Sequence, residues 1–153
     1  NNKALANYQA GNFEESKADY LKALDVLNKL ELDQFPEKKL VETIILTNMG
    51  LVYATLNDHQ TAISNYENAQ KIIEAGYLNS RLSEKQQRLS AVYNGFGTSY
   101  ESLGDIAKAN DYYLKALKAE REIGDKSGEG ITLNSIARLM AKRGNFRGAE
   151  LMY

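Results

Sequence analysis

The sequence predicts an all-α fold, an α-α superhelix (solenoid) of about four helix-turn-helix repeats, and three observations predict it. Six columns of residues recur in shared register along the 153 residues, as in the series Tyr20, Tyr66, Tyr113 and Tyr153. No segment of useful length alternates between polar and apolar residues, as a strand would. The single proline, Pro36, lies between two repeats, where it can begin a helix.

Each predicted repeat has a short turn, marked by a Gly or Asn followed by an Asp or Asn. The first residue suits the end of a helix and the second suits an N-cap. Glu15 follows Asn12 at the spacing of a capping box, and Gln86 follows Ser83 in the same way. The turns read Gly11-Asn12-Phe13, Asn57-Asp58-His59, Gly104-Asp105-Ile106 and Gly144-Asn145-Phe146.

Small residues on both helices of each pair predict a close crossing, with the tyrosine of the second helix beside it. The first helices carry Ala4, Gly50, Gly97 and Ala137. The second helices carry Ser16, Ala62, Ala109 and Ala149, each four residues before its tyrosine, and then Ala23, Ala69 and Ala116.

We expect eight helical segments in one array that covers residues 1–153. Gly76 and Gly124 lie where helices are expected to end. Both ends of the sequence fall inside repeats, so we expect a fragment of a longer chain. The segments are 2–10, 13–31, 36–56, 59–75, 83–103, 106–123, 127–143 and 146–153, and the repeats are approximately 1–31, 36–76, 83–124 and 127–153.

These columns resemble the tetratricopeptide repeat (TPR) family over essentially the whole chain. The third repeat shows the signature best, with Tyr93, Phe96, Gly97, Tyr100, Gly104-Asp105-Ile106, Ala109, Tyr113 and Ala116. The period of 40 residues or more is longer than the usual 34, and it resembles the long-period bacterial subclass. The resemblance implies a right-handed superhelix whose first helices line the concave face.

The concave face is the expected binding site for a protein or an extended peptide. Its asparagines can donate to and accept from a peptide backbone, or they can simply bond to neighbouring helices. Arg138 and Lys142 lie one turn apart and could hold an acidic peptide or carboxylate, or form a solvated basic face. The expected peptide-binding residues are Asn48, Leu51, Thr55, Asn94, Thr98, Asn134, Arg138 and Lys142.

Composition and charge exclude several kinds of partner and several kinds of site. The chain has 19 Lys+Arg and 20 Asp+Glu, a formal net charge of −1, which disfavours a nucleic-acid-binding repeat. The absence of cysteine excludes disulfides, thiolate metal sites and cysteine nucleophiles. No apolar run approaches the roughly 20 residues of a membrane span, so no membrane insertion is expected.

The sequence contains no convincing group for catalysis, metal or cofactor binding. His59 occupies a turn position that holds apolar residues in the other repeats, which favours packing over general-base chemistry. The glycine pairs Gly95/Gly97 and Gly128/Gly130 lack the third glycine and the preceding strand of a dinucleotide loop. We therefore expect no enzymatic activity and no cofactor.

The expected function is a non-catalytic protein- or peptide-binding scaffold. The alternative is a sensory or regulatory segment of a larger bacterial signalling protein, such as a sensor kinase or a transcriptional regulator. The clamp that related domains use to bind chaperone tails is not expected, because only Asn48 matches it. The other clamp positions hold Asn1, Leu5, Ala91 and Gly95.

Overall fold

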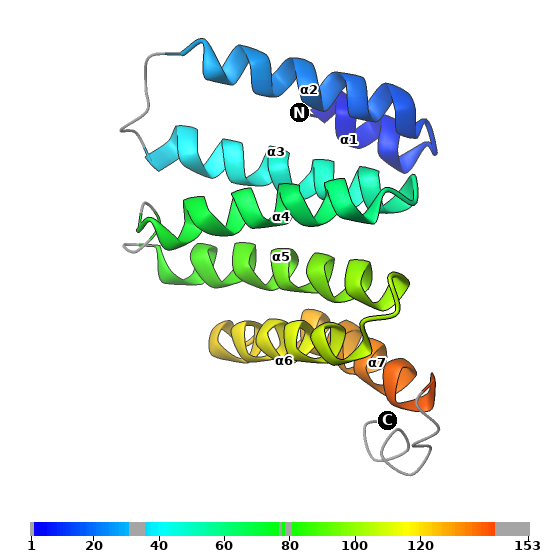
Figure 1. Ribbon diagram of the computed structural model, residues 1–153. Helices are drawn as coiled ribbons and strands as arrows, with labels where there is room; N and C mark the ends of the chain where they lie inside the picture. Colours follow the sequence, from blue (N-terminus) through cyan, green and yellow to red (C-terminus); the bar gives the residue numbers. More distant parts are fainter. Residues whose placement is uncertain (1, 31–35, 77, 79–80, 143–153) are drawn as a thin grey trace. The chain divides into compact units, whose positions relative to one another are not determined.

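The computed structural model describes residues 2–30, 36–76, 78 and 81–142, and all regular structure in them is α-helical (Figure 1). The predicted eighth helix, 146–153, and the residues Gly144, Asn145, Phe146 and Ala149 lie outside the described residues. The helices are α1 (Asn2–Gln9), α2 (Phe13–Asn28), α3 (Pro36–Thr55), α4 (His59–Glu74), α5 (Leu82–Ser102), α6 (Ile106–Ile123) and α7 (Lys126–Lys142).

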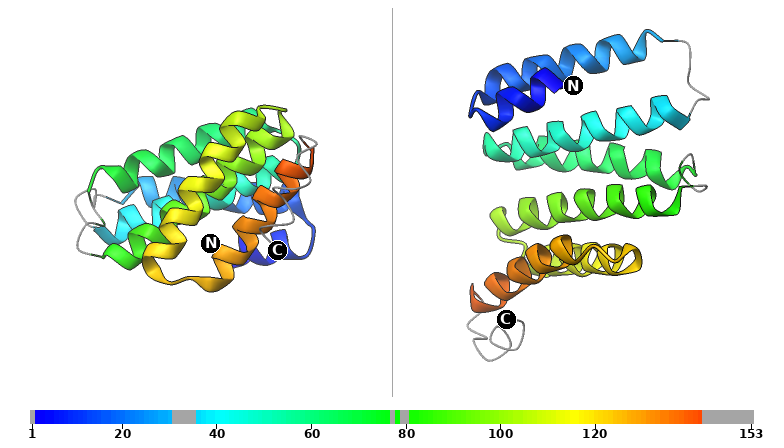
Figure 2. Two further views of the ribbon diagram at one scale, coloured as in Figure 1. Left: turned by 90° about the horizontal axis from the view of Figure 1, so that it is seen from below. Right: turned by 180° about the vertical axis from the view of Figure 1, so that it is seen from behind.

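The predicted all-α repeat fold is confirmed, and the helix boundaries differ from prediction by at most three residues. The largest difference is the end of α2, at Asn28 rather than at residue 31. The chain divides into a first unit, Asn1–Arg81, with α1 to α4, and a second unit, Leu82–Tyr153, with α5 to α7. Within each unit, consecutive helices run antiparallel, as the two views of Figure 2 show.

The three described turns have the predicted backbone conformation, and two of them have the predicted side-chain cap. Gly11, Asn57 and Gly104 have φ of 81°, 64° and 81°, the left-handed conformation that ends a helix. The carboxylates of Asp58 and Asp105 then accept hydrogen bonds from the backbone amides three residues ahead, both at 3.1 Å. Each helix pair therefore turns within a few residues.

Both predicted capping boxes are wrong. Asn12 is the N-cap of α2, but its side chain makes no capping hydrogen bond. Ser83 is the second residue of α5 and not its cap, because the helix already begins at Leu82. The Gln86 amide donates to Glu122 of α6 instead, so a contact between helices replaces the local one.

The predicted close crossings are confirmed for the first three repeats, whose helix pairs lie within the described residues. A Cβ added to Gly97 would lie 2.5 Å from Cε1 of Tyr113, and a Cβ added to Gly50 would clash with Tyr66 in the same way. In the first repeat Ala4 and Tyr20 are both completely buried. The small residue therefore leaves the space that the tyrosine ring of the partner helix fills.

Each unit has its own apolar core. In the first unit the core joins α1, α2 and α3, and in the second it joins α6 to α7. Burial of Ile136 and Leu139 holds one side of α7 against the preceding helices and leaves its other side in solvent. One buried cluster of the first unit contains Ala4, Tyr20, Leu27, Ile45, Met49 and Val52, and one of the second unit contains Ala109, Tyr113, Leu117, Ile136 and Leu139. Ile73 of α4 and Phe96 of α5 are also buried.

Candidate functional site

In the first unit, the predicted binding residues lie along α3. Leu51 is 44% exposed. The Thr55 hydroxyl donates to the Leu51 carbonyl at 2.9 Å, and it lies 3.1 Å from the hydroxyl of Tyr8 on α1. Asn48 is half-buried beside Tyr20. Burial raises the pKa of the Tyr20 hydroxyl, and the Asn48 side chain partly offsets that rise.

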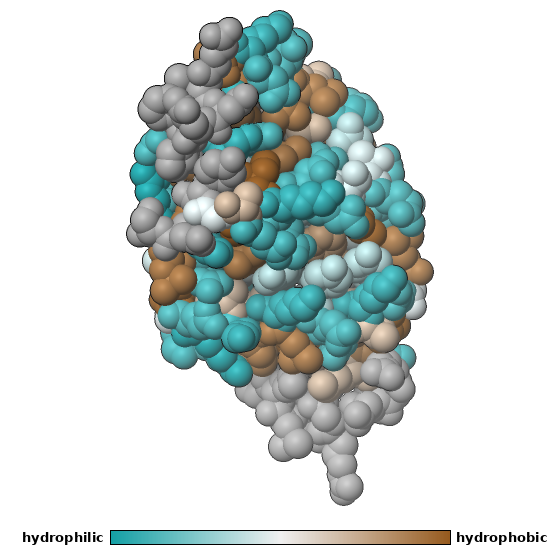
Figure 3. Space-filling model, turned by 60° about the vertical axis from the view of Figure 1, so that its left-hand side comes forward, coloured by the Kyte–Doolittle hydropathy of each residue, from teal (hydrophilic) through white to brown (hydrophobic). Residues whose placement is uncertain are grey.

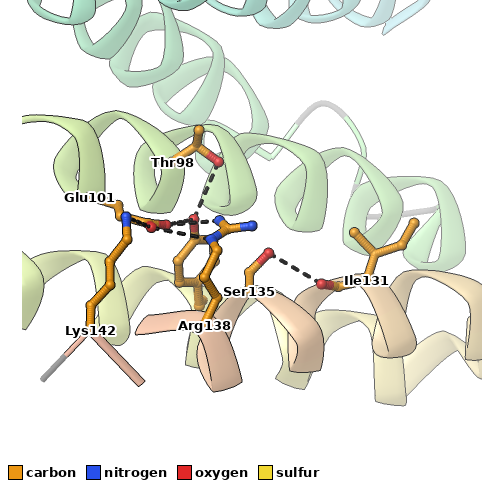
Figure 4. Close-up of polar contacts among 7 residues, drawn as sticks. Thr98, Glu101, Ile131, Ser135, Arg138 and Lys142 are labelled. Atoms are coloured by element: carbon orange, nitrogen blue, oxygen red, sulfur yellow. Dashed lines mark hydrogen bonds and ion pairs between the residues drawn. The ribbon is translucent and has the colours of Figure 1, made fainter. Parts of the chain in front are cut away.

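In the second unit, the predicted binding residues lie on α5 and α7, and all of them except the half-buried Asn94 are exposed. We define the α5–α7 face as a set of side chains that share one helix face on α5 and one on α7. Figure 4 shows several of them. Its members are Ala91, Thr98 and Ser102 of α5 and Ile131, Asn134, Ser135, Arg138 and Lys142 of α7, with Ser135 half-buried and the others exposed.

Among the described residues on the side shown in Figure 3, hydrophilic and hydrophobic residues are interspersed. Ile131 is the larger of the two apolar members of the α5–α7 face and is 65% exposed. None of the helices in the described part of the chain has the length and apolarity that a membrane crossing requires.

A buried carboxylate holds the two cations of the face in place (Figure 4). The side chain of Glu101 is only 6% exposed. Its Oε2 accepts from Nη2 of Arg138 at 2.9 Å and from the Tyr113 hydroxyl at 3.0 Å. Its Oε1 accepts from Nζ of Lys142 at 2.6 Å and from Nε of Arg138 at 3.3 Å. Thr98 extends the network, with its hydroxyl 3.3 Å from that of Tyr113.

These hydrogen bonds decide the charge of Glu101. Burial by itself would raise the pKa of the carboxyl, but the bonds from Arg138, Lys142 and Tyr113 outweigh it and lower the pKa to about 2. Glu101 is therefore ionised at neutral pH. It neutralises one of the two cations, and the cluster of Glu101, Arg138 and Lys142 carries a net charge of +1.

Asn94 lies in a second polar cluster, below the surface. Its Nδ2 donates to Oε1 of Glu120 at 2.9 Å and to the Thr132 hydroxyl at 3.0 Å. The Thr132 hydroxyl also lies 2.9 Å from Oε1 of Glu120. This cluster joins α5, α6 and α7. The Asn94 amide is therefore engaged by neighbouring helices, which is one of the two roles that the sequence left open.

The three asparagines do not share one register. Asn94 and Asn134 stand three residues before the small residue of their first helix, whereas Asn48 stands two residues before Gly50. Asn134 is exposed on the α5–α7 face, and Asn94 is half-buried. A regular ladder of amides is therefore absent from these three positions.

Sequence reasoning missed the two buried glutamates, although the repeat columns contain a signal for them. Glu120 occupies the column of Leu27 and Ile73, which are both buried. Glu101 occupies the column of Ala54. A charged residue in an otherwise apolar column indicates a special polar contact, because burying a carboxylate without partners is costly.

The described residues contain no group of three His, Cys, Asp or Glu side chains that could hold a metal ion. His59 lies at the start of α4, where its Nε2 is 3.1 Å from Oδ1 of Asn57 in the same turn. The half-buried ring makes this polar contact within the turn, at a position where the sequence predicts a packing residue.

Comparison with curated proteins finds relatives of this chain. Photosystem I assembly protein Ycf3 of Synechococcus elongatus is 26% identical over 113 residues, which cover 74% of this chain and 61% of that protein. The protein of the same name from a further Synechococcus strain gives the same values. The chain thus spans less than two thirds of the length of these curated relatives.

One solved structure with a similar chain is the crystal structure of BtubC (BKLC) from P. vanneervenii. It gives a TM-score of 0.43 at 20% sequence identity and covers 97% of this chain and 73% of that chain.

The family comparison agrees with the helix pairs. The profile of the tetratricopeptide repeat matches residues 1–26, 44–75 and 90–123, which together make up more than half of the chain. Each match covers most of one antiparallel pair, α1–α2, α3–α4 or α5–α6. The chain therefore belongs to the tetratricopeptide repeat family, whose repeats are scaffolds for protein interactions.

Proposed function

We propose that this chain is a non-catalytic, protein-binding segment, and that the α5–α7 face of the second unit receives an extended peptide of its partner. Membership of the repeat family supports a protein partner. The curated relatives are named as assembly proteins, a role that also consists of binding other proteins. A sensory or regulatory segment of a signalling protein would use the same face.

The observation that carries this proposal is the row of exposed hydrogen-bonding side chains on α5 and α7. An extended peptide presents unpaired N–H and C=O groups. The hydroxyl of Thr98 and the amide of Asn134 can each donate and accept, and Arg138 and Lys142 can donate. Ile131 adds one apolar contact. The face therefore offers both the backbone contacts and the side-chain contacts that peptide recognition uses.

Asn94 has an indirect part in this proposal. Its amide is committed to Glu120 and Thr132, so it positions α7 against α5 and does not contact the peptide. In the first unit, Leu51 and Thr55 are the exposed members of the predicted set. We propose that they contact a peptide on α3 by the same logic, with Asn48 beside them.

The test is a selection of binding peptides from a phage-displayed random library, followed by titration of the synthetic peptides against the purified chain. Ile131→Asp places a bulky charge on the α5–α7 face and should weaken binding about tenfold or more, or about 1.4 kcal/mol. The matched control is Leu114→Asp on α6, because Leu114 is also exposed, at 46%, and lies in the same unit.

Both variants should unfold at nearly the same denaturant concentration as the parent chain, because both sites are exposed. If the selected peptides bind Ile131→Asp as tightly as the parent chain, or if Leu114→Asp is the variant that loses binding, the α5–α7 face is not the binding site.

A further inference from the structure

In the cluster of Glu101, Arg138 and Lys142, the two cations have more positive charge and more N–H donors than Glu101 engages. Two positive charges face one buried carboxylate at 2.9 Å and 2.6 Å. Arg138 has five N–H donors and Lys142 has three. Two of the arginine donors and one of the lysine donors point at Glu101, and the Tyr113 hydroxyl also interacts with Arg138. Several N–H donors of Arg138 and Lys142, and one net positive charge of the cluster, therefore remain for a ligand.

The remaining donors are accessible to a ligand. The side chains of Arg138 and Lys142 are 49% and 55% exposed, whereas that of Glu101 is 6% exposed. Glu101 thus contacts the cations from the buried side of the face, and the other sides of both cations remain in solvent. The buried bonds also restrict the two long side chains, which lowers the conformational entropy that a ligand must overcome.

The surface around Arg138 and Lys142 favours an anionic side chain of a peptide over a carboxylate at the end of a chain. Hydroxyls of Thr98 and Ser135 lie along the same face, as Figure 4 shows. The side chains of both cations are about half exposed. The cations therefore stand on an open surface, which suits an acidic side chain within a bound peptide better than the carboxylate at the end of a chain, which would suit a closed pocket.

We propose that Arg138 and Lys142 form a carboxylate-binding subsite of the α5–α7 face, and that the partner peptide places an aspartate or glutamate side chain there. The inference rests on the proposed function and names the chemistry of the partner. Charge complementarity is its basis, because a hydrogen bond between charged groups is about twice as strong as a neutral one.

A similar cluster in the same unit provides an internal control. Glu129 accepts from Nε of Arg121 at 2.7 Å and from Nζ of Lys126 at 2.9 Å. This cluster also carries a net charge of +1, but neither of its cations belongs to the α5–α7 face. A carboxylate that binds by general attraction alone should favour neither cluster over the other.

The experiment titrates the chain with N-acetyl-aspartic acid α-amide and with the α-amide of N-acetyl-asparagine as the uncharged match. Side-chain N–H resonances of Arg138 and Arg121 report binding at the two clusters. The aspartate compound should give saturable shifts at Arg138 that exceed those at Arg121, and the asparagine compound should bind about fivefold more weakly or not measurably. Equal shifts at both clusters, or equal binding of the two compounds, would overturn the subsite.

Two variants make the test specific. Lys142→Gln removes one cation of the subsite and keeps the bond between Arg138 and Glu101. The variant should therefore bind the aspartate compound several-fold more weakly than the parent chain does. Lys126→Gln removes the matching cation of the control cluster and should leave binding at Arg138 unchanged. N-acetyl-serine, which carries a terminal carboxylate, should bind less well than the aspartate compound; tighter binding would reject the side-chain assignment.

Failure of this inference is separable from failure of the proposed function. Peptides selected from the random library that bind the α5–α7 face without an acidic residue, and as tightly to Lys142→Gln, would leave the function standing and remove the subsite. A subsite that binds the aspartate compound on a chain that selects no peptide at the face would remove the function and leave the subsite.

Discussion

Two buried glutamates of the second unit, Glu101 on α5 and Glu120 on α6, hold their carboxylates in opposite ways. Glu101 meets two cations and a phenol hydroxyl, and its pKa is lowered to about 2. Glu120 is 1% exposed and receives neutral donors from Thr132 and Asn94. Burial, partly offset by these donors, raises its pKa. Two carboxylates that are both buried therefore have opposite charge preferences, and the partners of each one decide which form is favoured.

The two clusters also differ in where they connect α7. The Glu101 cluster binds the C-terminal end of α7, at the surface, through Arg138 and Lys142. The Glu120 cluster binds α7 at Thr132, near its beginning and inside the unit. Substitutions in the two clusters should therefore differ in the size of their effect on the free energy of unfolding and in the direction of its pH dependence.

The largest effect is expected from Gly97→Leu, which should break the Glu101 cluster by displacing Tyr113. The ring of Tyr113 fills the space where a side chain at position 97 would lie. Overpacking of this kind should lower the free energy of unfolding by about 3 kcal/mol, measured by chemical denaturation. Gly130→Ala is the control, because a Cβ there meets no atom within 4 Å. A parental stability for Gly97→Leu would show that this crossing is loose.

The next largest effect is expected from Glu101→Gln, which keeps the shape of the side chain and removes its charge. Arg138 and Lys142 then lose their shared counter-ion, and we expect a loss of about 2 kcal/mol at pH 7. Lys142→Gln should cost less, because it leaves Glu101 paired with Arg138. Equal losses for the two variants would mean that the carboxylate contributes no more than a surface ion pair.

The pH dependence of the free energy of unfolding should report the ionisation of Glu101 in the same cluster. The pKa of Glu101 in the folded chain, about 2, lies below its ordinary value of 4.5. Its contribution is therefore present above pH 4.5 and is lost as the pH falls toward 2. The parent chain should lose more stability over this interval than Glu101→Gln, as measured by denaturation at each pH. Parallel curves for the two chains would contradict the lowered pKa.

A smaller effect is expected from Thr132→Val in the other cluster. The valine fills nearly the same volume but removes the hydroxyl that lies between Asn94 and Glu120. We expect a loss of about 1 to 2 kcal/mol, because the buried Glu120 carboxyl is left with one hydrogen-bond donor fewer. Ser135→Ala, which removes a hydroxyl of the same helix that bonds only its own backbone among the contacts described here, serves as the matched control.

The smallest effect, of opposite sign, is expected from Glu120→Gln. The raised pKa of Glu120 means that its stabilising contribution is complete below pH 4.5 and is lost as the pH rises through the folded-state value. A neutral amide avoids this loss, so the variant should gain about 0.5 to 1 kcal/mol at pH 8 relative to the parent. Asp125 and Glu129, which also raise the pKa of Glu120, remain in both chains. A loss of stability at pH 8 would show that the ionised carboxylate is the favoured state.

The helices and their turns could be predicted because they depend on local chemistry. Asp58 and Asp105 cap the helices that follow them, and Gly104 adopts the conformation that ends α5. The contact of Gly97 with Tyr113 could be predicted as well, because residues at fixed spacings share a helix face and the repeat multiplies the signal. Repetition made these features visible in a single sequence.

The roles of the polar side chains were decided only by the tertiary structure. The sequence placed Arg138 and Lys142 on one helix face, but their partner, Glu101, lies 37 and 41 residues away. Asn94 looked like Asn134 in the sequence, yet it turns to Glu120 because α6 and α7 pack beside it. A hydrogen-bonding side chain takes the partner that folding brings within about 3 Å, and no local spacing encodes that choice.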